Sequence, residues 1–206
     1  QHIKREKATS NICTAQALLA TMAGFYAVYH GPEGIRTIAE RIHSIAVFLE
    51  ESINRLGYKQ VNAQYFDTLR FALPDTISAQ QIRTIALSKE VNLRYFKNGD
   101  VGMSIDETTD IAAVNVLLSI FAIAAGRDWE KASDVPMASS ISAEMKRQST
   151  YLTHEVFNKY HTETEMMRYI KRHDRKDISL AHSMISLGSC TMKLNAAAEM
   201  LLLSRP

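Results

Sequence analysis

The stretch IRTIAERIHSIAVFLEESINRLG, residues 35–57, carries the strongest periodic signal in the chain. Its apolar residues recur every three or four positions, which places them on one face of a helix: Ile35, Ile38, Ile42, Ile45, Leu49, Ile53 and Leu56. Gly57 follows the last of them, and glycine readily adopts the left-handed backbone that ends many helices. The pattern therefore predicts a long helix that packs by one face.

The sequence before this stretch predicts another helix. Thr9 or Ser10 can cap it through a hydroxyl group, and apolar residues then recur at helical spacing from Ile12 to Tyr29. The residues His30, Gly31 and Pro32 follow. Because glycine tolerates a left-handed cap and proline fits the first turn of a helix, this tripeptide predicts the end of one helix and the start of the next.

After Gly57 the period changes from that of a helix to that of a strand. Residues 68–73 alternate apolar and other side chains, and Pro74 follows them. Ser78 is a suitable cap for a short helix that includes Ile82, Ile85 and Ala86.

A hairpin and a further helix complete this region. Residues 93–96 and 101–105 flank Asn98-Gly99, a dipeptide whose positive φ angles suit a tight turn between strands. Thr108 or Thr109 can cap the last helix, which Gly126 ends. Two helices followed by the order β-α-β-β-α predict a compact α+β fold.

The sequence beyond residue 126 is of a different kind. Residues 127–150 show only a weak pattern and are interpreted as a linker or an extended crossing of the surface. Thr162 and Glu165 have the spacing of a capping box and predict another helix. Its basic residues, Arg168, Lys171, Arg172, Arg175 and Lys176, are interpreted as a solvated helix end.

Composition limits the classes of function. A net charge of +2 over 206 residues is too small to favour a nucleic-acid or membrane partner. No apolar run reaches the roughly 18 residues of a membrane-spanning helix. Two cysteines, Cys13 and Cys190, make no disulfide framework and suit a reducing compartment, either the cytoplasm or an organelle matrix. The ends at Gln1 and Pro206 suggest a piece of a longer protein.

The segment SMISLGSCTMKLNAAAEM, residues 183–200, is the best candidate for a site. Gly188 frees the backbone to turn, and Ser189, Cys190 and Thr191 let several N–H and hydroxyl donors converge on an anion. Lys193 can add a full charge. The alternative interpretation is an ordinary turn that enters a helix.

Other chemistries have less support from the residues. Cys190 as a nucleophile would need a base, and only His182 is near it in sequence. The seven histidines show no metal-binding spacing, and no CxxC motif occurs. His161 lies beside Thr162, Glu163 and Glu165, where it either supports a site or hydrogen-bonds its own helix cap.

Six stretches closely resemble the P-protein of the glycine cleavage system, a glycine decarboxylase. They are collinear with that family and together span nearly the whole chain. They read REKATSNICTAQALLA (5–20), YHGPEGI (29–35), YFDTLRF (65–71), DETT (106–109), FNKYHTETEMMRYI (157–170) and SLGSCTMKLNAAAEM (186–200).

The resemblance implies a domain plan. Members of the family have two related halves, each built like a fold-type-I pyridoxal-phosphate enzyme. Residues 1–126 resemble the small α+β C-terminal domain of the first half, and residues 127–150 resemble the junction. Residues 151–206 resemble the start of the second half, a mainly helical and extended segment that is incomplete without its large cofactor domain.

The resemblance also implies a reaction and a site. The complete enzyme would use pyridoxal phosphate to release CO2 from glycine, and it would transfer the aminomethyl group to the lipoyl group of the H carrier protein. Residues expected to line its active site are Ser189, Cys190, Thr191, Lys193 and Asn195, supported by His161 and Glu163. The family's cofactor lysine follows a histidine, and no His-Lys dipeptide occurs here, so Lys193 does not take that role.

Two further expectations concern this chain by itself. Without the cofactor lysine it should be inactive alone, and it is expected to form a homo-oligomer. An alternative from a different class is an autonomous interaction or regulatory module, which a complete reading frame of this length would favour. If Cys13 and Cys190 face one cleft, they can also form an oxidation switch.

Overall fold

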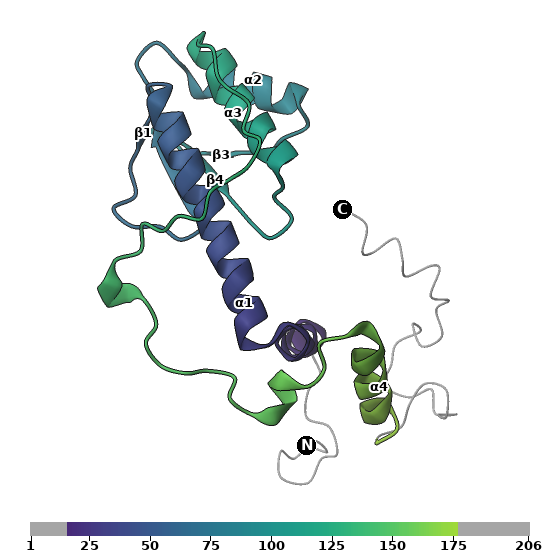
Figure 1. Cartoon of the computed structure of the whole chain (residues 1–206). Helices are drawn as coiled ribbons and strands as arrows, with labels where there is room; N and C mark the ends of the chain where they lie inside the picture. Colours follow the sequence, from purple (N-terminus) through teal and green to yellow (C-terminus); the bar gives the residue numbers. More distant parts are fainter. Residues whose placement is uncertain (1–15, 177–206) are drawn as a thin grey trace, which may run out of the picture. The chain divides into compact units, whose positions relative to one another are not determined.

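The computed structural model describes residues 16–176, which form two compact units (Figure 1). One unit consists of residues 32–151. The other contains residues 16–31 together with residues 152–176. Among the described residues, no helix has both the length and the apolar character needed to cross a membrane.

The chain order confirms an α+β fold with a four-stranded antiparallel sheet. The helices are α1 (Gln16–Arg55), α2 (Ala79–Ser88), α3 (Ile111–Ala125) and α4 (Glu163–Asp174). The strands are β1 (Lys59–Gln60), β2 (Thr68–Ala72), β3 (Arg94–Tyr95) and β4 (Val101–Ser104), in the spatial order β1-β2-β4-β3. The two-residue strand β1 was not predicted from the sequence.

Helix α1 is interrupted where the sequence predicts a break. Gly31 has φ 63° and ψ −177°, outside the helical region, and Pro32 follows it at the start of the second part. The predicted cap at Thr9 or Ser10 lies outside the described residues.

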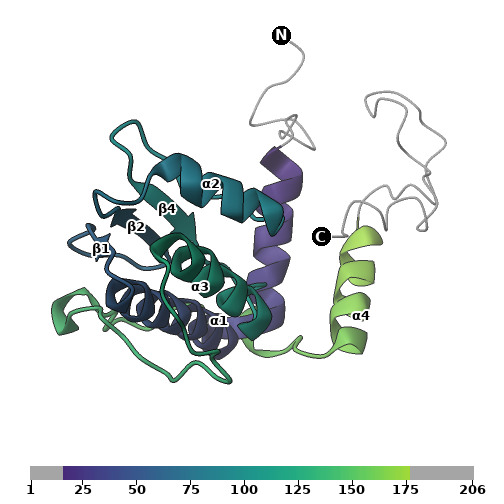
Figure 2. The same cartoon turned by 90° about the horizontal axis from the view of Figure 1, so that it is seen from above.

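The core lies between one face of the sheet and the helices. Leu69 faces Met103 and Phe71 faces Val101 in the antiparallel register of β2 and β4, and all four side chains are buried. Alternate residues of the same strands, such as Arg70 and Gly102, belong to the opposite face. The second part of α1 contributes a buried stripe to this core, and α2 and α3 lie side by side (Figure 2).

The hairpin between β3 and β4 turns as predicted but through a different geometry. Gly99 has φ 91°, whereas Asn98 does not have a positive φ. The N–H of Phe96 donates to the carbonyl oxygen of Asp100 and the N–H of Gly99 donates to that of Phe96, each at 3.0 Å. This is a three-residue loop with a left-handed glycine rather than the two-residue turn.

Local signals locate most helix ends correctly. The Ser78 side chain accepts from the N–H of Gln81, and Gly126 ends α3 with φ 59°. The prediction that Thr108 or Thr109 caps α3 is wrong, because Asp110 is the cap and accepts from the N–H of Ala113. The two threonine side chains instead donate to the Asp106 carboxylate, which holds its pKa below the ordinary value.

Candidate functional site

His161 is the predicted site residue that the structure places most clearly. It lies just before α4, and its Nδ1 is 2.7 Å from the carbonyl oxygen of Tyr29, at the end of the first part of α1. A carbonyl oxygen only accepts, so Nδ1 carries a proton, and in the neutral ring Nε2 keeps its lone pair. The histidine therefore contacts a residue 132 positions away rather than its own helix cap.

The backbone on both sides of His161 is fixed by local hydrogen bonds. Before it, the Asn158 side-chain amide donates to the carbonyl oxygens of Leu152 and His154, at 3.2 and 3.1 Å. After it, Thr162 and Glu165 form the predicted capping box, which is confirmed in both directions. These turns fix the path of the chain that enters and leaves His161.

Glu163 begins α4 and is exposed. Its carboxylate lies at the positive end of the helix dipole, where a negative charge is stabilising. Its role beside His161 in an active site stays a prediction.

Aromatic side chains attach α4 to the first part of α1. The ring of Tyr169 stacks on Tyr160 at 4.4 Å and meets Phe25 edge-on at 5.9 Å. The Arg172 guanidinium lies 5.3 and 5.4 Å from the Tyr160 and Tyr169 rings. A cavity of about 310 Å³ lies beside this cluster, between Phe25, Val28 and residues of the 156–173 region. One residue of the predicted solvated basic run thus packs on aromatic rings.

The other predicted site residues lie outside the described residues. They are Cys13, Ser189, Cys190, Thr191, Lys193 and Asn195. Their predicted roles in anion binding, in cofactor contact and in an oxidation switch stay predictions.

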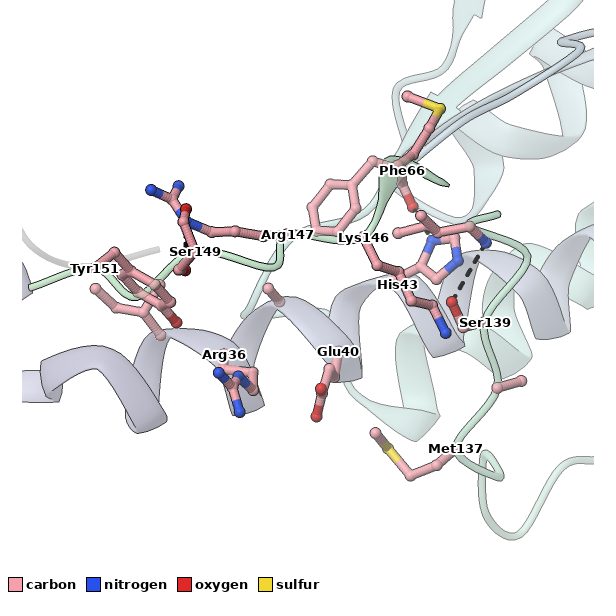
Figure 3. A pocket seen from close by; sticks show the side chains of 15 residues that line it. Arg36, Glu40, His43, Phe66, Met137, Ser139, Lys146, Arg147, Ser149 and Tyr151 are labelled. Carbon is pink, nitrogen blue, oxygen red and sulfur yellow. Dashed lines mark hydrogen bonds between the residues drawn. The ribbon is translucent and has the colours of Figure 1, made fainter. Parts of the chain in front are cut away.

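A larger groove lies within the unit of residues 32–151, between the second part of α1 and residues 137–151 (Figure 3). Its volume is about 820 Å³. Figure 3 shows Tyr151 and Arg147 at one end and His43 and Ser139 at the other. Its apolar lining includes Ile35, Ala39, Phe66, Ile141 and Met145.

Two adjacent buried residues of α1 hold one wall of this groove. The N–H of Ser140 donates to Nε2 of His43 at 3.0 Å, while Nδ1 of His43 lies 2.7 Å from the carbonyl oxygen of Phe66. Ser44 accepts from the N–H of Ala138 at 3.0 Å and donates to the carbonyl oxygen of Glu40 at 2.7 Å. Both ring nitrogens of His43 are therefore satisfied when Nδ1 carries the single proton.

The charged residues of the groove are mainly basic. Arg36, Lys146 and Arg147 line it together with one carboxylate, Glu40. All four are exposed, so their charges are accessible to a ligand. An apolar lining with basic side chains suits a partly apolar anion.

Tyr65 supports the same region from the loop before β2. Its hydroxyl donates to the Glu50 carboxylate, and its ring lies 5.7 Å from that of His43. Burial is the main cause that raises the pKa of Tyr65 to about 12, and the hydrogen bond to the Glu50 carboxylate is the second cause.

Sequence reasoning missed this groove for an identifiable reason. His43 and Ser44 stand between Ile42 and Ile45 of the predicted helix, and the weak pattern of residues 127–150 predicts only a linker or a surface crossing. Two adjacent polar residues inside a buried stripe are a signal that something must satisfy them. The signal does not say which distant segment does so.

Comparison with known proteins settles the family. The family model described as "Glycine cleavage system P-protein" matches residues 1–121, more than half of the chain. The chain belongs to the glycine cleavage system P-protein family.

Individual P-protein relatives match along the whole chain. A protein of Bacteroides fragilis strain YCH46, named "Glycine dehydrogenase (decarboxylating)", is 83% identical over 204 residues, covering 99% of this chain and 22% of the relative. Relatives with the same printed name from Bacteroides thetaiotaomicron and Flavobacterium johnsoniae are 80% and 53% identical over 206 residues, covering 22% and 21% of their lengths. The chain therefore spans about a fifth of the P-proteins it matches.

Proposed function

We propose that this chain is part of a pyridoxal-phosphate-dependent glycine dehydrogenase of the P-protein family. The complete enzyme releases CO2 from glycine and transfers the remaining aminomethyl group to the lipoyl group of the H carrier protein. The observation that carries this proposal is the 83% identity over 204 residues to a relative named "Glycine dehydrogenase (decarboxylating)".

Within that enzyme, residues 1–126 belong to the small domain of the first half, which is of the fold-type-I transferase kind. Residues 127–150 join the halves, and residues 151–206 begin the second half. The α+β topology of the described residues supports this assignment in outline. Homo-oligomerisation and a location in the cytoplasm, or in an organelle matrix in other organisms, complete the proposal.

Residues of this chain serve a cofactor whose lysine lies elsewhere in the enzyme. Pyridoxal phosphate, when bound, supplies the electron sink for decarboxylation. Ser189, Cys190 and Thr191 offer N–H, hydroxyl and thiol donors to an anionic group, and Lys193 and Asn195 add polar contacts nearby. His161 and Glu163 support them. Residues 189–195 lie outside the described part of the chain.

A comparison of this chain with the intact enzyme tests the proposal. The intact P-protein carrying this sequence, with H-protein, pyridoxal phosphate and glycine, should exchange labelled CO2 into glycine. The 206-residue chain under the same conditions should release no CO2 and leave the cofactor spectrum unchanged. Absence of exchange by the intact, folded enzyme would reject the activity, and turnover by the chain alone would reject its dependence on the missing lysine.

A further inference from the structure

The helix break at Gly31 lies directly against His161. A Cβ atom added at Gly31 would lie 2.7 Å from the carbonyl oxygen of Phe157 and 2.8 Å from Cε1 of His161. Real Cβ atoms essentially never approach so closely. Gly31 also has φ 63°, a backbone conformation that residues with side chains rarely adopt. Two independent constraints, space and backbone geometry, thus require glycine here.

The same break supplies the group that orients the imidazole. Tyr29, two residues before Gly31, accepts from Nδ1 of His161 at 2.7 Å. Within residues 16–176, Nε2 of His161 has no hydrogen-bond partner. His161 is exposed, so this nitrogen is accessible. With its proton on Nδ1, the ring presents an acceptor outward, which can receive a hydrogen bond from an N–H or O–H group but not bind a carboxylate.

We infer that Gly31 is a positioning residue of the P-protein, which seats His161 so that Nε2 accepts a hydrogen bond from a donor group such as the amine of the substrate. This inference rests on the proposed function. Gly31 acts through His161 by leaving the space that the ring occupies. The Tyr29 carbonyl oxygen fixes which ring nitrogen carries the proton.

Nuclear magnetic resonance on the 206-residue chain tests the geometry without any activity. Long-range ¹H–¹⁵N correlation spectra distinguish the two neutral tautomers of histidine, and His161→Gln identifies the His161 signals. At about pH 8.5, above the ordinary range of histidine titration, the wild-type chain should show His161 with its proton on Nδ1. A wild-type ring protonated on Nε2 would overturn the inference.

Variants distinguish a specific effect of Gly31 on His161 from a general loss of folding. Gly31→Ala should shift the His161 signals toward a mixture of tautomers, whereas Gly24→Ala should leave them unchanged, because nothing lies within 4 Å of a Cβ added at Gly24. Asparagine tolerates the left-handed backbone better than alanine, so Gly31→Asn keeps the added Cβ with less backbone strain. It should shift the signals even if Gly31→Ala does not fold. Unchanged His161 signals in a folded Gly31 variant would refute the positioning role.

Kinetics of the intact enzyme test the link to the reaction. Asparagine can replace the Nδ1 donor of histidine but has no Nε2, so His161→Asn should lower kcat/KM for glycine in CO2 exchange by about tenfold or more. Gly31→Ala should lower it similarly, and the double variant should lose no more than the more severe single variant. Multiplicative losses would contradict action through His161. Wild-type enzyme without exchange would reject the proposed function, while the tautomer result would stand.

Discussion

The backbone N–H of Ser140 donates a hydrogen bond of 3.0 Å to Nε2 of His43, which stands 97 positions earlier in the chain. His43 is 2% exposed, and its other nitrogen faces the carbonyl oxygen of Phe66. This one buried side chain therefore joins α1 to both the loop before β2 and the segment that closes the groove. Losing either contact leaves a buried polar group without a partner.

Substitutions of His43 should distinguish the two contacts. Asparagine can replace the Nδ1 donor and glutamine can replace the Nε2 acceptor, so each variant keeps one bond and loses the other. Each should lower the free energy of unfolding by about 1–3 kcal/mol, measured by chemical denaturation. Only His43→Asn should increase proteolysis within residues 137–151, because it loses the contact to Ser140. Equal proteolysis of both variants would contradict the role of the Ser140 contact in holding this segment.

Ser44→Ala should also loosen the segment over the groove. The hydroxyl is buried, and its removal leaves the N–H of Ala138 without the acceptor it has at 3.0 Å. We expect a loss of about 1–3 kcal/mol in unfolding free energy. Ser88→Ala is the matched control, since that exposed hydroxyl only donates to a carbonyl oxygen of its own helix. A control loss equal to that of Ser44→Ala would refute the importance of the buried contact.

Alkaline conditions should destabilise the 32–151 unit through Tyr58. Burial raises the pKa of Tyr58 from 10.0 to about 12, although the positive charge of Arg127 acts to lower it. The Tyr58 hydroxyl donates to the carbonyl oxygen of Phe121 at 2.8 Å. Since the folded state holds this proton more tightly than the unfolded state, the stabilisation is complete below pH 10 and declines toward pH 12.

Comparison of Tyr58→Phe with wild type isolates this effect. The variant lacks the titrating hydroxyl, so the difference in unfolding free energy between the two proteins should narrow as the pH rises from about 10 to 12. Tyrosinate absorbance should show one fewer late-titrating group in the variant. A difference independent of pH in this range would mean that the Tyr58 pKa is not raised.

Substitutions at the start of α3 test whether Asp110 caps this helix. Asp110→Ala removes the side chain that accepts from the N–H of Ala113 at 2.8 Å and should cost about 1 kcal/mol of stability. Thr108→Ala, which removes a contact to the Asp106 carboxylate in an exposed loop, should cost less than half as much. Thermal or denaturant unfolding of the two variants compares them directly. The reverse order would restore the threonine cap.

Local sequence patterns predicted the parts of the fold that depend on neighbours in the chain. The apolar stripe of residues 35–56, the Ser78 cap, the left-handed Gly126 and the Thr162–Glu165 capping box are all confirmed. Each depends on backbone and side-chain groups within a few residues. The predicted threonine cap of α3 is wrong because Thr108, Thr109 and Asp110 are all suitable caps, and only the backbone path selects Asp110.

By itself, the sequence determined the family, the α+β class and the position of the helix break at Gly31, because these depend on residue identity and short-range spacing. Only the tertiary structure decided which distant residue packs against the break. The contacts of His161 with Tyr29 and of Ser140 with His43 join residues 132 and 97 positions apart. Such pairs leave no periodic signal, since any buried polar group needs a partner and folding alone selects which distant segment supplies it.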